Sequence, residues 1–349
     1  MQIGPQRRGR RPPAAAVRFP GVAALDPDLL ARAAARVFGA GATVDGVRRM
    51  SGGASRETWS FDLRDAQGTL HRLVLRRDPG AHVGQSERAT EYALLTAAAD
   101  AGVPVPRVRF LLEPDDELGR GFVMDRVEGE TIARRILRDD EYAAARPLLA
   151  SQCGEIAARI HAIDAGAVSP LELQGAEVQI ERYTELLDVS NEPHPAFELA
   201  RQWLLANAPP DPVSPQVVHG DFRNGNFIVG ADGIRSVLDW ELTHLGNPVE
   251  DLGWLCVKSW RFGVTDRVVG GFGDVDDLLA AYERAGGRHV ERDELRYWVV
   301  LGTLKWGVIC VGQAFTHLNG IVRSVELATL GRRVAEMEWD VLDLLDGGW

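Results

Sequence analysis

The residues of this chain best suited to chemistry lie in two segments that are close together in the sequence. The first ends a hydrophobic run in the turn His219-Gly220, and Asp221 then stands five positions before Asn226. The second contains Asp239, within the run Val-Leu-Asp-Trp-Glu. A carboxylate that accepts a hydroxyl proton, together with an amide oxygen and a second carboxylate that hold a divalent metal, is the set of groups that phosphoryl transfer needs. These residue types and spacings therefore predict a metal-assisted phosphoryl-transfer site.

A short hairpin has to bring the two segments together. Strand-like runs cover residues 226–229 and 236–239. A hairpin of this length lets Asn226 and Asp239 face one another at the strand ends, with Asp221 on the loop beside them. Asp221 taken alone could equally be a residue that caps a loop. Asn226 and Asp239 in register favour the catalytic interpretation.

The chain before these segments alternates between helical and strand-like patterns. Asp26-Pro27 is typical of a helix start, Gly39 is placed to end that helix, and apolar residues repeat at helical spacing between them. Further predicted elements are strands at 58–63 and 73–76 joined by a polar loop, a helix at 86–100, and strands at 108–112 and 122–127. We therefore expect an α+β N-lobe over residues 23–127, an antiparallel sheet with one packed helix.

The rest of the chain is predicted to be mainly helical. The expected helices cover residues 142–163, 195–208, 249–260, 276–285, 292–315 and 324–345. This pattern predicts a bilobal molecule, with a hinge at residues 124–129. The C-lobe, residues 128–349, is expected to hold the catalytic loop and the acceptor site.

Composition restricts the class of protein. The hydrophobic fraction of 45% and the charged fraction of 26% are ordinary for a globular protein, and the net charge of −11 argues against nucleic acid as a partner. No run reaches the roughly 18 unbroken apolar residues of a membrane span, so no membrane partner is expected. Residues 1–22 are basic and lack the apolar core of a secretory signal. They predict a disordered tail, with a basic contact to a partner as the alternative.

The positions of the cysteines and the lack of certain motifs restrict the class of protein further. Cys153, Cys256 and Cys310 lie far apart without metal-ligand spacing, which is typical of buried thiols in a reducing compartment. With no secretory signal, this predicts a cytoplasmic location. The chain has no GxxxxGK[ST] and no GxGxxG between a strand and a helix, which excludes the P-loop and Rossmann classes on motif.

The motifs resemble those of a known family. His-Gly-Asp-x-x-x-x-Asn at residues 219–226, followed by a strand and by Leu-Asp-Trp-Glu at residues 238–241, is the signature of aminoglycoside and choline kinases and their relatives, which share the protein-kinase fold. The run at residues 246–252, with its Pro and Asp-Leu, also matches. The chain is most similar to the branch that includes the kinase-like domain fused to some acyl-CoA dehydrogenases. The similarity covers roughly residues 45–260.

The resemblance implies a role for each residue of the catalytic run. Asp221 matches the catalytic base. Arg223 matches the position of the lysine in the protein-kinase catalytic loop, which offsets charge on the moving phosphoryl group, although it could instead pair with a surface carboxylate. Asn226 and Asp239 match the magnesium ligands.

Three further residues have supporting roles by the same resemblance. His219 and Asp251 are expected to hold the loop by hydrogen bonds, and His219 is not expected to act as a base. Glu241 is expected to reach metal-bound water.

The resemblance also implies a nucleotide site in the N-lobe. The loop over the phosphates corresponds to Ser51, Gly52, Gly53, Ala54 and Ser55, whose small side chains let backbone N–H groups approach phosphate oxygens. Because alternate strand residues share a face, Val74 would line the adenine pocket while Arg76 reaches the phosphates in place of the family's lysine. Glu91 is the expected ion-pair partner of Arg76. The adenine edge is expected to bond the backbone of Met124, Asp125 and Arg126.

Plainer interpretations stay open for these N-lobe residues. Gly52 and Gly53 could form only a turn. Arg76 and Glu91 could be ordinary surface charges.

Taken together, these assignments predict a small-molecule kinase with Mg²⁺ as cofactor and ATP or GTP as co-substrate. Arginine at the lysine position leaves the choice of nucleotide open. The alternative is a catalytically silent nucleotide-binding module, a pseudokinase. Oligomeric state is not predicted.

The acceptor is expected to be a small hydroxyl compound. An aminoglycoside-like acceptor needs a carboxylate-lined pocket, and the candidates, unless they are solvated helix faces, are Glu294, Glu326, Glu336 and Glu338. A hydroxyacyl-CoA-like acceptor is suggested by the resemblance. Three aromatic residues of the C-terminal part belong either to the core or to the acceptor site, namely Trp298, Trp306 and Phe315.

Overall fold

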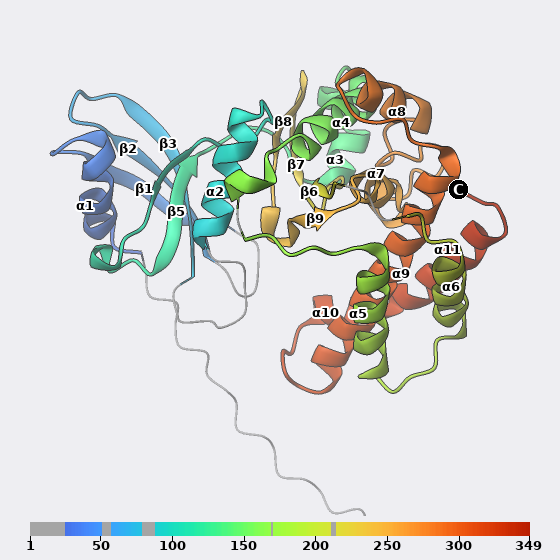
Figure 1. Ribbon diagram of the computed structural model, residues 1–349. Helices are drawn as coiled ribbons and strands as arrows, with labels where there is room; N and C mark the ends of the chain where they lie inside the picture. The colour runs from blue at the N-terminus through green and yellow to red at the C-terminus, as the bar shows by residue number, and fades with distance from the viewer. Residues whose placement is uncertain (1–24, 51–56, 79–87, 169, 211–213) are drawn as a thin grey trace, which may run out of the picture.

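The computed structural model describes residues 25–50, 57–78, 88–168, 170–210 and 214–349. Figure 1 shows two lobes, a sheet flanked by helices and a larger, mainly helical part. The tail predicted at residues 1–22 and the phosphate loop predicted at residues 51–55 lie outside the described residues.

The N-lobe is built on a five-stranded sheet in the order β1-β2-β3-β5-β4, with every neighbouring pair antiparallel. Its strands are β1 (Thr43–Arg49), β2 (Glu57–Arg64), β3 (Leu70–Asp78), β4 (Val108–Leu111) and β5 (Arg120–Asp125). The predicted antiparallel sheet is therefore confirmed. The sequence does not predict β1, because its residues are all exposed or half-buried and lack the alternation of a half-buried strand.

Helices cover both faces of this sheet. Alternate residues of β3 point to opposite faces, so Leu73 and Leu75 pack in the core formed with α1 (Pro27–Phe38), while Val74 packs in the larger core that includes α2 (Arg88–Asp100). The sequence predicts one packed helix. The structure has α2 on the C-lobe side and α1 as a second helix on the other side.

The C-lobe consists of helices interrupted by two short antiparallel ribbons. The helices are α3 (Ala133–Arg138), α4 (Arg146–His161), α5 (Ala176–Asp188), α6 (Pro195–Ala206), α7 (Val249–Cys256), α8 (Val275–Arg284), α9 (Arg292–Leu318), α10 (Val325–Leu330) and α11 (Val334–Leu345). The ribbons pair β6 (Gln216–Val218) with β9 (His244–Gly246) and β7 (Phe227–Gly230) with β8 (Gly233–Val237). These two ribbons frame the predicted catalytic run.

Two predicted helices of the C-lobe differ from the structure, and two observed helices, α3 and α5, are not predicted. α5 is not predicted, because only Ala176, Gln179 and Ile180 of this helix are buried and its apolar stripe is short. The helix expected over 249–260 ends at Cys256, where the guanidinium of Arg261 donates to the Cys256 carbonyl oxygen from a following 3₁₀ turn, η5 (Lys258–Arg261). The helix expected over 324–345 is broken between α10 and α11 by a 3₁₀ turn that begins at glycine.

α9 is the central helix of the C-lobe. It is long and apolar enough to cross a membrane, but 61% of its most apolar window is buried inside the molecule. α5, α6, α7, α10 and α11 all contact it, which is the packing of a core helix. The sequence leaves open whether the aromatic residues of this helix belong to the core or to the acceptor site. Trp298 is a core residue, whereas Trp306 and Phe315 are half-buried.

Close packing between α4 and α8 depends on Gly154. A Cβ at this position would lie 2.3 Å from the carbonyl oxygen of Leu278 and 2.8 Å from the backbone nitrogen of Tyr282. We expect Gly154→Ala to lower the free energy of unfolding by about 1–3 kcal/mol, because the helices must move apart. Urea unfolding followed by circular dichroism measures this.

Gly312 on α9 provides the matched control. A Cβ there meets nothing within 4 Å, so Gly312→Ala is expected to raise stability by about 0.5–1 kcal/mol through lower backbone entropy in the unfolded chain. Equal effects at the two glycines would contradict the packing described here.

Candidate active site

The turn that carries Asp221 requires glycine. Gly220 adopts φ 79°, in the left-handed region that glycine enters without steric cost. A Cβ at Gly220 would lie 2.4 Å from the carbonyl oxygen of Leu242, so a larger residue does not fit without movement of the backbone. This constraint explains why glycine stands between His219 and Asp221.

Asp251 holds the same turn through its backbone amides. Its Oδ2 accepts the N–H of His219 at 2.8 Å and its Oδ1 accepts the N–H of Gly220 at 2.9 Å. Nε2 of His161 lies 3.1 Å from Oδ2, and the other nitrogen of that ring lies 2.9 Å from the Tyr282 hydroxyl. Burial acts to raise the pKa of Asp251, but the hydrogen bonds and charge of its partners outweigh it and lower the pKa overall. Asp251 is therefore a buried, ionised clamp on the loop.

His219 links the turn to the end of β8. Its Nδ1 accepts the N–H of Asp221 at 3.2 Å, and its Nε2 lies 3.1 Å from the carbonyl oxygen of Leu238. Burial lowers the pKa of His219, which favours a neutral ring that carries its proton on Nε2. Both ring nitrogens are thus used for holding the loop, as the sequence predicts.

Three donors orient the carboxylate of Asp221. Oδ1 accepts from Nε of Arg223 at 2.9 Å and from Nε1 of Trp254 at 2.8 Å. Oδ2 accepts from Nδ2 of Asn226 at 2.6 Å. The guanidinium of Arg223 also lies over the Trp260 ring, 4.3 Å from its centre. The alternative that Arg223 pairs with an unrelated surface carboxylate is wrong, since its partner is Asp221.

Asn226 and Asp239 lie at the same end of the β7–β8 hairpin. The N–H of Leu238 donates to the carbonyl oxygen of Asn226 at 2.8 Å, and Asp239 is the residue after Leu238. Because the amide nitrogen of Asn226 is bonded to Asp221, its Oδ1 is the atom left to face other groups. Asp239 has φ 61° and ψ 63°, a left-handed conformation that costs a non-glycine residue about 1 kcal/mol or more and is concentrated at functional sites.

Arg76 connects the N-lobe sheet to this hairpin. Its Nη1 lies 2.9 Å from Glu91 on α2, and its Nη2 lies 2.9 Å from Glu241 and 3.3 Å from Asp239. The Arg76 and Glu91 side chains are 14% and 1% exposed, so the alternative that they are plain surface charges is wrong. Arg88 also pairs with Glu91. The resemblance predicts that Glu241 reaches metal-bound water. In the structure its carboxylate binds Arg76.

The predicted adenine region lies where β3 and β5 pair. Val74 stands opposite Met124 in the register, and both side chains pack in the larger core. The N–H groups of Asp125 and Arg126 each donate to a backbone carbonyl of a neighbouring segment at 2.9 Å. Both amides are therefore engaged within the protein.

The oxygen atoms at the hairpin end fit a magnesium ion. No group of three or more His, Cys, Asp or Glu within the described residues forms a metal site by itself. Magnesium is commonly bound through one or two protein oxygens and completes its shell with phosphate oxygens and water. Asn226 Oδ1 and the Asp239 carboxylate, which is 51% exposed, would be the protein oxygens that hold it.

Sequence reasoning gives no role to two side chains that support the site, Trp254 and His161. Trp254 follows Asp251 by three positions on α7, so one helical turn places both on the side of the catalytic loop. That spacing is a signal in the sequence from which a role for Trp254 could have been predicted. His161 carries no such signal, because it reaches Asp251 from α4, 90 positions away.

Comparison with known proteins identifies a family. Residues 46–296 match the phosphotransferase enzyme family. Acyl-CoA dehydrogenase family member 10 of Mus musculus is 31% identical over 237 residues, which are 64% of this chain and 21% of that protein. Acyl-CoA dehydrogenase family member 11 of Gallus gallus is 28% identical over 302 residues, 78% of this chain and 37% of that protein. The chain thus spans well under half the length of these relatives.

Solved structures share the fold. A protein assigned as an aminoglycoside phosphotransferase from Ralstonia eutropha JMP134 superposes with a TM-score of 0.73 at 24% identity, covering 91% of this chain and 98% of that one. A choline/ethanolamine kinase family protein from Mesorhizobium loti gives 0.59 at 22% identity, with 90% and 93% covered. These likenesses show the bilobal kinase-like fold. Since one family accounts for residues 46–296, more than half of the chain, the chain belongs to the phosphotransferase enzyme family.

Proposed function

We propose that this chain is a kinase that moves the γ-phosphoryl group of ATP or GTP to a hydroxyl group of a small molecule. The observation that carries the proposal is the convergence of Asp221, Asn226 and Asp239 at one place. Asp221 and Asn226 are hydrogen-bonded, and Asn226 and Leu238 are bonded across the hairpin that ends at Asp239. Family membership supports the same reaction class.

Asp221 is the base in this proposal. Its Oδ1 already accepts two hydrogen bonds, whereas Oδ2 accepts one, so Oδ2 has a lone pair for the hydroxyl proton. The proton moves from the acceptor hydroxyl to Oδ2. A bond forms between the acceptor oxygen and the γ-phosphorus, and the bond to the bridging oxygen breaks to release the nucleoside diphosphate. Arg223, beside Asp221, offsets negative charge on the moving group.

Asn226 and Asp239 would hold Mg²⁺, which when bound neutralises charge on the phosphates. Solved structures of the shared fold support a nucleotide as co-substrate. One is a spectinomycin phosphotransferase in complex with ADP and spectinomycin, with a TM-score of 0.63 at 11% identity and 92% of this chain covered.

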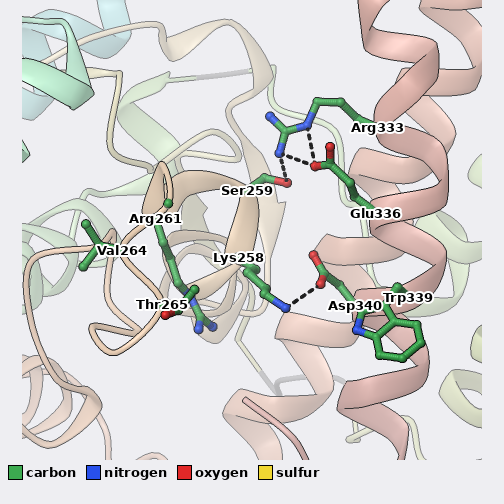
Figure 2. A pocket seen from close by; sticks show the side chains of 10 residues that line it. Lys258, Ser259, Arg261, Val264, Thr265, Arg333, Glu336, Trp339 and Asp340 are labelled. Atoms are coloured by element: carbon green, nitrogen blue, oxygen red, sulfur yellow. Dashed lines mark hydrogen bonds and ion pairs between the residues drawn. The ribbon is translucent and has the colours of Figure 1, made fainter.

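Paired charges disfavour an acceptor that carries several ammonium groups. Of the four carboxylates that could have lined a pocket for such an acceptor, three have cationic or histidine partners from the chain itself: Glu294 with Arg288, Glu336 with Arg333, and Glu338 with His194. A cavity of about 380 Å³ between η5 and α11 contains Glu336 and Asp340, and both are paired there (Figure 2). We therefore propose an acceptor without multiple ammonium groups, of which a hydroxyacyl thioester is one class.

A coupled assay for nucleoside diphosphate release tests the proposed function. The acceptors to compare are amino sugars, amino alcohols and hydroxyacyl thioesters. We expect turnover with at least one hydroxyl compound and little with the amino sugars. Tight magnesium-nucleotide binding without turnover on any acceptor would support the pseudokinase alternative instead.

Arg76 is expected to dominate the N-lobe contribution to nucleotide binding. Arg76→Met removes the cation that bridges the lobes, and we expect nucleotide affinity to fall about tenfold or more, since a hydrogen bond to a charged group contributes about 1.5–3 kcal/mol. Isothermal titration with magnesium-ATP measures the change.

Arg36→Met is the matched control for Arg76→Met. Arg36 makes a bidentate ion pair with Asp116 on the far side of the sheet, with contacts of 2.5 and 2.9 Å. We expect this variant to lose stability but keep nucleotide affinity. Equal losses of affinity in both variants would contradict the role of Arg76.

A further inference from the structure

Lys305 is a buried lysine in the middle of α9 that contacts Gly220 and Trp254, two residues next to Asp221 in the site. It is 5% exposed, and its ammonium donates to the carbonyl oxygen of Gly220 at 3.0 Å. The same nitrogen lies 4.6 Å from the centre of the Trp254 ring, whose N–H donates to Asp221. One side chain therefore contacts the peptide group that leads into Asp221 and the indole that orients its carboxylate.

Burial of this ammonium has an electrostatic cost that one carboxylate compensates. Glu250 lies 3.6 Å away, and its other oxygen is bonded to Gln179 at 2.6 Å and to His244 at 3.0 Å. Burial acts to lower the pKa of Lys305, but Tyr183, Glu250 and the other acidic groups around it outweigh this effect and raise the pKa overall. Lys305 is therefore charged within the core.

Stability alone does not explain a lysine at this position. The neighbouring positions of α9 are apolar and buried, among them Leu301, Leu304 and Val308. Replacement of buried ion pairs by apolar residues of similar volume is often neutral or stabilising. The contact that ties this lysine to the catalytic turn is the hydrogen bond to Gly220.

We propose that Lys305 is a positioning residue of the phosphoryl-transfer site, which fixes the Gly220 carbonyl and the Trp254 indole and thereby the direction of the Asp221 carboxylate. The inference rests on the function proposed above for Asp221. The amide of Gly220 is bonded to Asp251 and its carbonyl to Lys305, so both polar groups of this left-handed residue are held.

Loss of this contact is expected to slow the reaction and to spare nucleotide binding. Without Lys305 the buried Gly220 carbonyl loses a charged donor, and the turn gains freedom to rotate. A displacement of about 1 Å at the reacting groups can cost about a hundred-fold in rate. Arg76 and Asp239, the groups proposed to bind the nucleotide and the metal, contact each other at the end of the β7–β8 hairpin, whereas Lys305 contacts the Gly220 carbonyl.

Lys305→Met, which keeps the length and removes the ammonium, is the variant for the test. We expect kcat to fall about ten- to a hundred-fold while KM for magnesium-ATP changes less than about twofold. Lys305→Met leaves the buried carboxylate of Glu250 without its lysine cation. The double variant Lys305→Met with Glu250→Gln removes that carboxylate as well. We expect it to regain thermal stability but not kcat, which separates positioning from support of the fold.

Arg292→Met is the control, because Arg292 lies on the same helix, α9, and also ends in an ion pair, with the exposed Asp276, but has no role in the proposed site. It should leave kcat unchanged. Wild-type kcat in Lys305→Met overturns the inference, and so does recovery of kcat together with stability in the double variant. In both cases the wild type still turns over, so the proposed function stands. A wild type with no turnover overturns the proposed function and this inference together.

Discussion

Asp221→Asn is expected to reduce kcat by about a hundred-fold or more while affinity for magnesium-ATP stays within a few-fold of the wild type. The amide can no longer take the hydroxyl proton, and loss of a positioned acid–base group costs about 10²–10⁴-fold. Its carbonyl oxygen can still accept from Arg223 and Trp254. The amide of Asn226 loses its bond to Oδ2 but keeps its bond to the backbone carbonyl oxygen of residue 221, so the loop should keep its shape. Steady-state turnover and isothermal titration, measured on the same preparation, separate the two effects.

Asp232→Asn is the control for this substitution. Asp232 is an exposed carboxylate on the β7–β8 turn, paired with Arg235 at 2.9 Å and remote from the hairpin end that carries Asp239. It should behave as the wild type. If Asp221→Asn kept full turnover, or lost nucleotide binding in parallel with turnover, Asp221 would not be the base.

Asp239→Ala is expected to abolish the part of nucleotide binding that depends on magnesium. The substitution removes one of two proposed protein ligands, and a metal ion bound between protein and phosphates contributes several kcal/mol. We expect affinity for ATP in Asp239→Ala to be the same with and without magnesium. Asp239→Asn should be measured beside it, because asparagine tolerates the left-handed backbone of this residue better than alanine.

Glu241→Gln is the control for the metal prediction. Glu241 and Asp239 both contact Nη2 of Arg76, so either change perturbs that arginine. Of these two carboxylates, only Asp239 is proposed as a magnesium ligand. Magnesium dependence should therefore survive in Glu241→Gln, and its survival in Asp239→Ala would show that the metal assignment is wrong.

The sequence predicts those parts of the site that depend on short-range spacing. Asp221 and Asn226 lie five positions apart, and Asp239 is brought to them by a single hairpin. The pairing of Arg76 with Glu91 is implied by the family resemblance, and strand alternation supports the face assigned to Arg76.

The remaining parts depend on helix packing that no local pattern encodes. His161 and Lys305 reach the catalytic turn from α4 and α9, 90 positions from Asp251 and 85 positions from Gly220 respectively. Periodicity indicates which side of a helix is buried, but it does not indicate which backbone carbonyl a buried lysine meets. The same reason explains the missed α5, whose role is set by its contact with α9 rather than by its own apolar stripe.

Transfer of a labelled phosphoryl group tests whether this chain phosphorylates a hydroxyl compound with the help of magnesium. Wild-type protein is incubated with magnesium and ATP labelled in the γ-phosphoryl group, together with the hydroxyl compound that gives the highest turnover, and the products are analysed by mass spectrometry. We expect a labelled phosphate ester of the acceptor in equal amount to the ADP formed, and none when magnesium is chelated. Label found only in inorganic phosphate, or ester formed equally well without a divalent metal, would contradict it.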